Sequence, residues 1–304
     1  MIDPPRVPVD IATVRRQFDA RAARFTRHDW LPREIGRRMV ERLELMRVDV
    51  QRIADVGCGT GGAFDDLRRR FPEAQWLGID LSLGMLRAGP PPSGPVARFV
   101  RRLRPLAQAR VCADAERLPL ADASIDLVFS NLMLHWHPAP HRVIPEWRRI
   151  LRVDGLLMFS CFGPDTLKEL RRAVTAVEPR SRPMPYVDMH DFGDMLVAAG
   201  MATPVMDAEV LTLTFPDARA ALREVSALGG NPRHDRWPAL WSSRRAHALL
   251  DALDARRGPD GRIALSFEVA YGHAWNPQPR AARMNTVAVD DLRRELVARR
   301  KAPQ

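Results

Sequence analysis

Residues 53–62 read IADVGCGTGG, and no other segment constrains the fold of this chain as strongly. A short apolar run passes through an acid, Asp55, into a glycine-rich turn, and residues 63–71 then have the pattern of a helix. Glycine adopts turn conformations that other residues avoid, and it lets a ligand lie against the main chain. A strand, a tight turn and a helix in this order are typical of an open α/β sheet, which binds nucleotides at the carboxyl ends of its strands.

The glycines fit two nucleotide-binding templates. Gly57, Gly59 and Gly62 satisfy the dinucleotide fingerprint of NAD-dependent dehydrogenases. The pattern Asp-x-Gly-x-Gly-x-Gly, which runs from Asp55 to Gly61, is that of class I methyltransferases, which use S-adenosylmethionine (SAM). An acid directly before the glycines favours SAM, because SAM carries a sulfonium and an ammonium group whereas a dinucleotide carries a pyrophosphate. A dehydrogenase remains the rival interpretation.

Two later segments have the pattern of strands that end in a carboxylate. Residues 75–80 read QWLGID, and the carboxylate of Asp80 can accept hydrogen bonds from both ribose hydroxyls. Residues 109–114 read ARVCAD, and Asp114 could accept a hydrogen bond from the adenine amino group. An acid at each of these places is expected in a SAM site, and the order of the elements supports that interpretation.

A fourth predicted strand, residues 124–131, ends at Asn131 beside the same crevice. Cys58 lies inside the glycine turn, where we interpret it as a packing residue. With Cys112 and Cys161 it has the spacing of neither a zinc site nor a disulfide framework. The predicted cofactor-binding residues are Asp55, Gly57, Cys58, Gly59, Gly61, Asp80, Leu81, Met85, Asp114, Ala115 and Asn131.

The charge of the chain bears on its partners. Its formal net charge is +10, and lysine occurs only at positions 168 and 301, so the basic residues are almost all arginine. A basic surface favours acidic partners. The densest arginine cluster lies in residues 89–107, which we interpret as a solvated insertion. No apolar run is long enough to span a membrane and no signal pattern precedes the first helix, so we expect a cytoplasmic protein without membrane contact. We also expect a monomer.

Three stretches of the chain resemble the malonyl-acyl-carrier-protein O-methyltransferases of biotin synthesis. These are NLMLHW at 131–136, WRRILR at 147–152 and FSCFGPDTLKELR at 159–171. Residues 18–25, FDARAARF, and residues 192–229 also resemble that family. The family usually has tyrosine where this chain has Phe25. A related branch that resembles assembly factors of respiratory complex I shares the fold and is expected to modify a protein or another small molecule, and it stays open as the alternative.

The resemblance implies a fold and a division of the chain. We expect a Rossmann-like, seven-stranded sheet, mostly parallel with an antiparallel last strand, with helices on both faces and a helical insertion before the last strand. The order of patterns predicts a helix over 139–152 that ends at 153–155, a helix opened by proline at 164–178, and a strand or strand pair at 203–215. The expected parts are N-terminal capping helices (1–50), a SAM-binding core (51–163), a part with the acceptor pocket (164–280) and a basic tail (281–304).

The implied reaction transfers the methyl group of SAM to the free carboxylate of a malonyl thioester on an acidic acyl carrier protein. A carboxylate is ionised at neutral pH and needs no general base, so we expect alignment of the reactants and no catalytic side chain. Arg171 and Arg172 are the candidates to hold this carboxylate. We expect Phe25, His135 and Trp136 to line the acceptor pocket.

Other interpretations are disfavoured by particular residues. A metal site at His135, His137 and His141 would need a defined geometry and further ligands, so we expect no metal. Enzymes that methylate amino groups of nucleic acids commonly place Asn-Pro-Pro-Tyr after the fourth strand, whereas Asn131 is followed here by Leu-Met-Leu. No nucleic-acid partner is therefore expected. A non-enzymatic assembly factor is disfavoured because the acids of the cofactor site are intact.

Overall fold

The computed structural model describes residues 7–89, 108–235 and 242–278. Almost all of the arginine-rich insertion at 89–107 and the whole basic tail at 281–304 lie outside the described residues. The helices in chain order are α1 (Ile11–Phe25), α2 (Trp30–Glu44), α3 (Phe64–Arg70), α4 (Leu83–Ala88), the short 3-10 helix η1 (Leu134–Trp136), α6 (Pro140–Ile150), α7 (Lys168–Val177), α8 (Met189–Ala198), α9 (Ala218–Leu228) and α10 (Ser243–Asp254).

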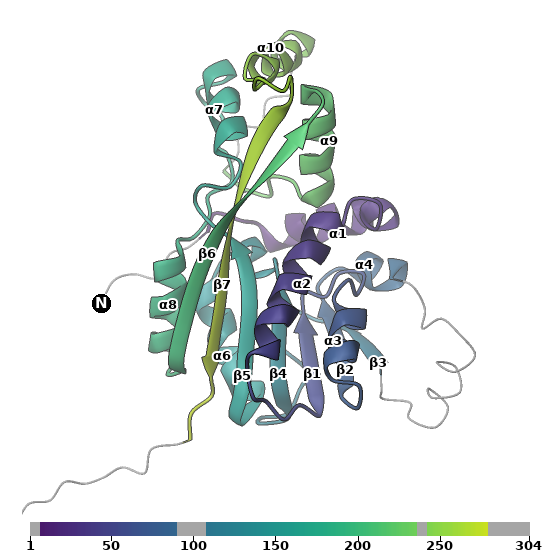
Figure 1. Cartoon of the computed structure of the whole chain (residues 1–304), viewed down its shortest axis with the longest axis vertical. Helices are drawn as coiled ribbons and strands as arrows, with labels where there is room; N and C mark the ends of the chain where they lie inside the picture. Colours follow the sequence, from purple (N-terminus) through teal and green to yellow (C-terminus); the bar gives the residue numbers. More distant parts are fainter. Residues whose placement is uncertain (1–6, 90–107, 236–241, 279–304) are drawn as a thin grey trace, which may run out of the picture.

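Seven strands of the described chain form one sheet in the order β3-β2-β1-β4-β5-β7-β6, with helices on both faces (Figure 1). The strand β7 runs antiparallel to both of its neighbours, and the other neighbouring strands are parallel. This confirms the predicted sheet with its antiparallel last strand. The strands are β1 (Arg52–Val56), β2 (Gln75–Asp80), β3 (Gln108–Cys112), β4 (Ile125–Asn131), β5 (Leu151–Phe162), β6 (Ala202–Phe215) and β7 (Ile263–Trp275).

The central strands are apolar on both faces, and each face has its own hydrophobic core. In β4, Leu127 and Phe129 point into one core and Val128 points into the other, because side chains alternate along a strand. The first core packs against α2, whose Ile35, Met39 and Leu43 are fully buried at spacings of four residues. The second core contains the apolar faces of α6 and α8. These two layers fix the sheet between helices.

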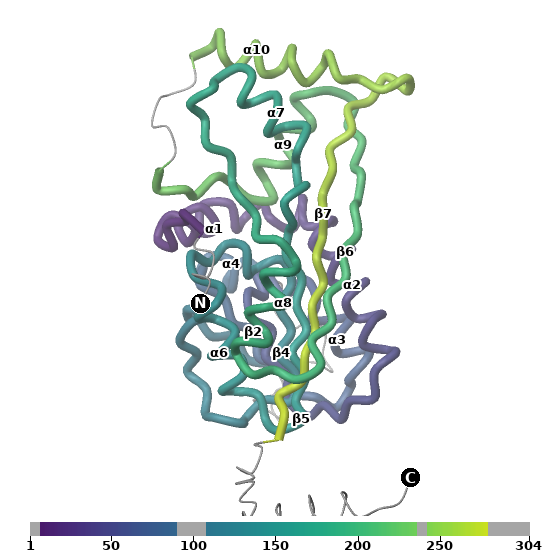
Figure 2. Tube along the Cα trace, turned by 90° about the vertical axis from the view of Figure 1, so that its left-hand side faces the viewer, coloured from purple at the N-terminus to yellow at the C-terminus, as the bar shows by residue number. Residues whose placement is uncertain are grey.

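The helices α9 and α10 lie between β6 and β7 in the chain, as the predicted insertion requires. Figures 1 and 2 show that α7, α9 and α10 gather at one end of the long strands β6 and β7, beyond the ends of β1 and β4. The helix α1 lies between this group and the parallel part of the sheet. None of the helices in the described ranges is long and apolar enough to cross a membrane.

The prediction that residues 153–155 end the helix before the fifth strand is wrong. That strand, β5, begins at Leu151 directly after α6, and Asp154 takes a left-handed conformation with φ of 59° inside it. The pairing of β4 with β5 shifts register here, which is how a bulge accommodates extra residues. Asn276 exchanges backbone hydrogen bonds with Asp154 and Gly155, each 2.9 Å long, so the bulge is stabilised by the end of β7.

The predicted helix at 164–178 is shorter than expected, because its first four residues are held by β7. The backbone N–H of Leu167 donates to the carbonyl of Ser266 at 2.6 Å, and the Thr166 hydroxyl donates to the carbonyl of Glu268 at 2.9 Å. Leu167 also has φ of 55°, which a helix does not allow, and α7 begins at Lys168. Residues 203–215, for which one strand or a pair was open, belong to the single strand β6.

Candidate cofactor and acceptor site

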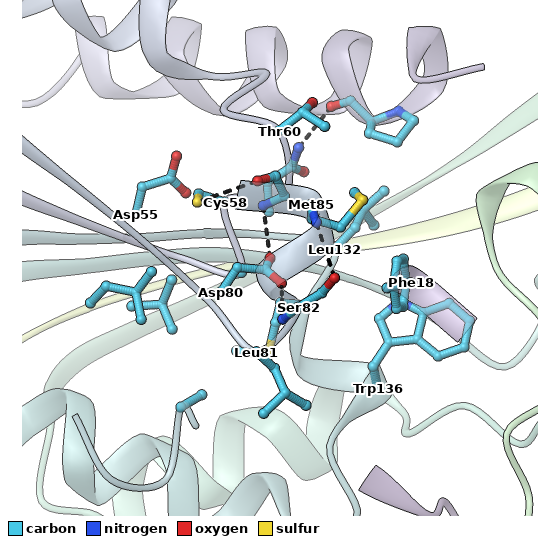
Figure 3. Close-up of a pocket in the computed structure, with 18 of the residues that line it drawn as sticks. Phe18, Asp55, Cys58, Thr60, Asp80, Leu81, Ser82, Met85, Leu132 and Trp136 are labelled. Carbon is cyan, nitrogen blue, oxygen red and sulfur yellow. Dashed lines mark hydrogen bonds between the residues drawn. The ribbon is translucent and has the colours of Figure 1, made fainter. Parts of the chain in front are cut away.

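A pocket opens at the carboxyl ends of β1, β2 and β4, beneath α1 (Figure 3). Every predicted cofactor residue except Gly61 lines it. The lining comprises Asp55, Gly57, Cys58, Gly59, Asp80, Leu81, Met85, Asp114, Ala115 and Asn131, together with Phe25 and Trp136 from the predicted acceptor set. The strand order thus brings together residues that are far apart in the chain, and their roles toward a ligand remain predictions.

The glycine turn after β1 has a backbone that only glycine adopts without strain. Gly57, Gly59 and Gly61 have φ of 79°, 56° and 88°. A β-carbon at Gly57 would lie 2.4 Å from the side chain of Met133. The N–H groups of Gly57 and Cys58 donate to the carbonyl of Ile79 at 2.7 and 3.0 Å, which ties the turn to β2. The main chain is therefore fixed where a ligand can lie against it.

Asp80 at the end of β2 organises this turn. Its Oδ2 accepts a hydrogen bond from the backbone N–H of Gly59 and its Oδ1 accepts one from Ser82, both at 2.8 Å (Figure 3). Burial raises the pKa of Asp80 to about 6. A carboxylate has about four acceptor positions, so two remain for donors of a ligand, such as a pair of hydroxyls.

Asp55 is the most deeply placed acid of the pocket. Its Oδ2 accepts a hydrogen bond of 3.3 Å from the indole N–H of Trp76. Burial, and then the nearby charge of Asp80, raise the pKa of Asp55 to about 7. A cation bound beside Asp55 would favour the ionised carboxylate and lower this pKa again. The residue is therefore poised to interact with a positively charged ligand.

Asp114 is oriented by a histidine that the sequence analysis weighed only as a metal ligand. His137 accepts a hydrogen bond at Nδ1 from the N–H of Ala139 at 3.1 Å, so the proton of the neutral ring is on Nε2. This Nε2 lies 3.4 Å from Oδ1 of Asp114. The interaction with His137 holds the pKa of Asp114 below its usual range, so the acid is an ionised acceptor at neutral pH.

Asn131 has a side chain that is already committed to other partners. Its Nδ2 donates to the carbonyl of Pro32 at 2.7 Å, and its Oδ1 accepts from the hydroxyl of Ser160 at 2.8 Å. These bonds fasten the first turn of α2 to the carboxyl ends of β4 and β5. Asn131 thus lines the pocket while it holds the neighbouring helix in place.

The helix α1 roofs the pocket and is held there by contacts to the opposite wall. Oδ1 of Asp19 accepts hydrogen bonds from the hydroxyl of Ser82 at 2.6 Å and from the N–H of Gly84 at 2.8 Å. Phe18 packs edge-on against Trp136, with 5.4 Å between ring centroids. Figure 3 shows Phe18 and Trp136 side by side at the edge of the site.

Several lining residues were not among the predicted site residues, and most of them come from α1, α2 or the loops around the turn. They include Arg15, Phe18, Arg33, Ser82, Met133, Phe162 and Leu228. Phe18 begins the segment FDARAARF, whose resemblance to a family was the one signal that could have located it. The others have no local signal, because their place depends on how the helices pack.

The sequence predicts that His135 lines the acceptor pocket, but the structure places it behind Trp136. Its ring packs against Phe162 and Tyr186, with centroid distances of 4.9 and 5.8 Å. Complete burial lowers the pKa of His135 to about 3, so the imidazole is neutral. The two residues are successive in the 3-10 helix η1, so their side chains point in different directions, and Trp136 rather than His135 lines the cavity.

The two predicted carboxylate anchors are not brought to this pocket. Arg171 and Arg172 lie on α7, which packs against α10 and β7, and neither lines the pocket. Two other arginines do line it, Arg15 from α1 and Arg33 from α2. Among the residues in the described ranges, no three histidines, cysteines or acids lie together as metal ligands would.

Comparisons with known proteins agree with this geometry. Residues 54–159 match the family model described as a methyltransferase domain. The YcgJ protein of Bacillus subtilis, a solved structure, aligns with 81% of this chain and 99% of its own length, with a TM-score of 0.53 and 15% identity. A likeness at this identity shows the fold alone, and the fold is that of the class I methyltransferases.

Curated relatives match nearly the whole chain. A protein of Laribacter hongkongensis named malonyl-(acyl-carrier protein) O-methyltransferase is 46% identical over 90% of this chain and 92% of its own length. A protein of the same name from Gallionella capsiferriformans is 41% identical over 90% of this chain and 94% of its own length. The chain belongs to the family of malonyl-(acyl-carrier protein) O-methyltransferases.

Proposed function

We propose that this chain transfers the methyl group of SAM to the free carboxylate of a malonyl thioester carried by acyl carrier protein, a step toward a biotin precursor. The observation that carries the proposal is that three acids, Asp55, Asp80 and Asp114, converge on one pocket in a chain whose relatives bear that name. These acids suit the donor, and the relatives' names indicate the acceptor.

The donor set of the pocket fits SAM. Asp80 has acceptor positions left for the two ribose hydroxyls, and ionised Asp114 can accept from the adenine amino group. Asp55 would face the cationic methionyl part of SAM. We propose that Arg33 faces the methionyl carboxylate, because it lines the pocket and its Cγ lies 3.7 Å from a β-carbon built at Gly62. Its Nε donates to Asp29 at 2.7 Å, so the Nη groups are the donors proposed for this role.

The mechanism requires alignment and exclusion of water. SAM supplies an electrophilic methyl group on its sulfonium, and the acceptor carboxylate is already ionised at neutral pH. The aromatic and apolar side chains that line the pocket can hold the acceptor in line and keep water out. They are Phe18, Phe25, Leu132, Trp136, Phe162 and Leu228. No general base is needed, so catalysis rests on this alignment.

The acceptor carboxylate needs a positive or hydrogen-bonding group, and its identity stays a prediction. Arg171 and Arg172 could serve only if the acceptor extends beyond the described pocket toward α7. Phe25 lines the pocket where the family usually has tyrosine. Restoring that hydroxyl therefore tests where the carboxylate lies.

Incubation with SAM and malonyl-loaded carrier protein, followed by intact-mass spectrometry, tests the proposal. The expected result is one methyl group on the malonyl carrier and none on an acetyl carrier, which has no free carboxylate. Equal methylation of both carriers, or methylation of neither, would refute the malonyl carboxylate as the acceptor. Calorimetric titration tests the donor separately, since binding of NADH without binding of SAM would refute it.

A further inference from the structure

A second hollow lies beside the cofactor pocket, between α1, α9 and α10. Its floor is apolar, with Leu222, Leu249 and Leu250, and its walls carry four arginines, two from α1 and two from α9. The lining comprises Arg21, Arg24, Phe25, His28, Arg219, Leu222, Arg223, Ser226, Ala227, Ala246, Leu249 and Leu250. No acidic residue is among these lining residues. We call this hollow the arginine groove.

The arginines of the groove lack carboxylate partners, unlike many arginines elsewhere in the molecule. Arg149, for example, pairs with Glu146 and Asp122 at 2.7 and 2.6 Å. Within the described ranges, neither Arg21 nor Arg24 forms an ion pair, and the same holds for the groove arginines of α9. The four positive charges therefore face the hollow without neutralisation from the described protein.

Arg21 gives a second sign that the groove suits an anion. Its Nη1 is buried and has no hydrogen-bond partner among the described residues. Burial also lowers the pKa of this guanidinium, whose central carbon lies 5.3 Å from the centroid of the Phe18 ring. A buried donor without a partner is costly, and an anionic ligand would satisfy it.

The groove and the cofactor pocket share one residue. Phe25, the last residue of α1, lines both, and Leu228 of α9 lines the cofactor pocket while Leu222 of the same helix lines the groove. A flexible chain that lies in the groove can therefore reach past Phe25 to the methyl-transfer site. Nδ1 of His28, which follows α1, lies 2.9 Å from Oε1 of Glu224 on α9, and this contact joins the two helices beside the groove.

We propose that the arginine groove is the docking site of the acidic carrier protein and of the phosphopantetheine arm that holds its acyl group; this inference rests on the proposed function. The groove arginines pair with the phosphate of the arm and with carrier carboxylates. The leucine floor contacts the alkyl parts of the arm, and the acyl end passes Phe25 into the pocket. Charge complementarity selects this occupant, because the groove presents four arginines and no acid.

Binding of a fluorescently labelled carrier, loaded with malonyl-phosphopantetheine, tests the docking site without turnover when S-adenosylhomocysteine replaces SAM. Arg24→Glu and Arg223→Glu reverse exposed charges on the two walls. Arg47→Glu is the matched control. Arg47 is exposed in the loop between α2 and β1, at the amino end of β1 and so at the opposite end of the parallel strands from the pocket. We expect each groove variant to weaken carrier binding about tenfold or more and the control to change it less than about twofold.

A small acceptor separates docking from chemistry. Methylation of malonyl-N-acetylcysteamine, which lacks both carrier and phosphate, should keep its KM within about twofold in the groove variants. Carrier affinity equal to wild type in Arg24→Glu and Arg223→Glu would overturn the docking site, as would displacement of the carrier by a single-stranded DNA oligonucleotide at equal concentration. Carrier binding that depends on the groove, without methylation of any malonyl substrate by the wild type, would instead overturn the proposed function alone.

Discussion

Replacement of Asp80 by asparagine separates two tasks of this carboxylate. One is to fix the backbone at Gly59 and Ser82, and the other is to accept hydrogen bonds from the ribose of SAM. In the structure it accepts backbone hydrogen bonds from Gly59 and Ser82, both at 2.8 Å. Asparagine offers one acceptor oxygen, so one of these N–H groups would face an amide N–H. That cost, about 1–3 kcal/mol, falls on the free protein and on the complex alike, and it should appear as a lower Tm.

The loss of SAM affinity in Asp80→Asn comes from a lost hydrogen bond to a ribose hydroxyl. A hydroxyl that donates to a carboxylate contributes about 1.5–3 kcal/mol, and Asp80→Asn removes at least one such bond. Each 1.4 kcal/mol is tenfold in Kd, so we expect SAM to bind about 10- to 150-fold more weakly. The measurement is calorimetric titration at pH 8, where Asp80, with a pKa of about 6, is ionised.

Asp65→Asn on α3 is the control for this measurement, because Asp65 is an exposed acid that does not line the pocket. It should leave the SAM affinity unchanged. A Kd for Asp80→Asn within about twofold of wild type would refute the assignment of the ribose to β2.

Three further outcomes follow from the same geometry. Because Asp55 has a pKa of about 7 in the free protein, its neutral form gives no charge attraction to a cation below that pH, and SAM should bind more tightly, by about tenfold or more, at pH 7.5 than at pH 6. Asp55→Asn should reduce this change, measured by calorimetry, to the roughly twofold that Asp80, with a pKa of about 6, contributes. The raised pKa of Asp55 also means that the free protein loses stability as pH rises through 7, so a Tm that rises there would contradict it. Phe25→Tyr should increase kcat/KM for the malonyl carrier about 3- to 10-fold at unchanged SAM affinity, because a tyrosine hydroxyl can donate a hydrogen bond to the malonyl carboxylate. An unchanged or lower kcat/KM would place that carboxylate elsewhere. Asp19→Ala removes the hydrogen bonds to Ser82 and Gly84, so limited proteolysis should cut α1 faster and SAM should bind about tenfold more weakly. Protection of α1 equal to that in the wild type would show that other contacts hold this helix.

The parallel core was predictable from local patterns. Apolar runs such as 127–129 can be buried on both faces only in a central strand, and the glycines at 57, 59 and 61 lie at positive φ as their pattern indicates. The carboxylates at the strand ends then meet at one edge of the sheet because parallel strands place their carboxyl ends together. Asp80 and Asp114 follow from this rule alone.

The acceptor side was less predictable, because it is assembled from segments far apart in the chain. A run such as His135-Trp136 places both side chains near the site but does not tell which one faces the cavity. The hydrogen bonds of the Thr166 hydroxyl and the Leu167 backbone N–H to β7 redirect the chain before α7, which carries Arg171 away from the pocket. The arginine groove joins α1 to α9, and no local periodicity relates these two helices.

The position of the transferred methyl group decides whether the malonyl carboxylate is the acceptor. Incubation with SAM labelled in its methyl group with deuterium, followed by fragmentation of the carrier and its arm in the mass spectrometer, reports where the label lies. We expect the label in a methyl ester at the free end of the malonyl group. Label on the carrier polypeptide, on the arm or nowhere would contradict this expectation.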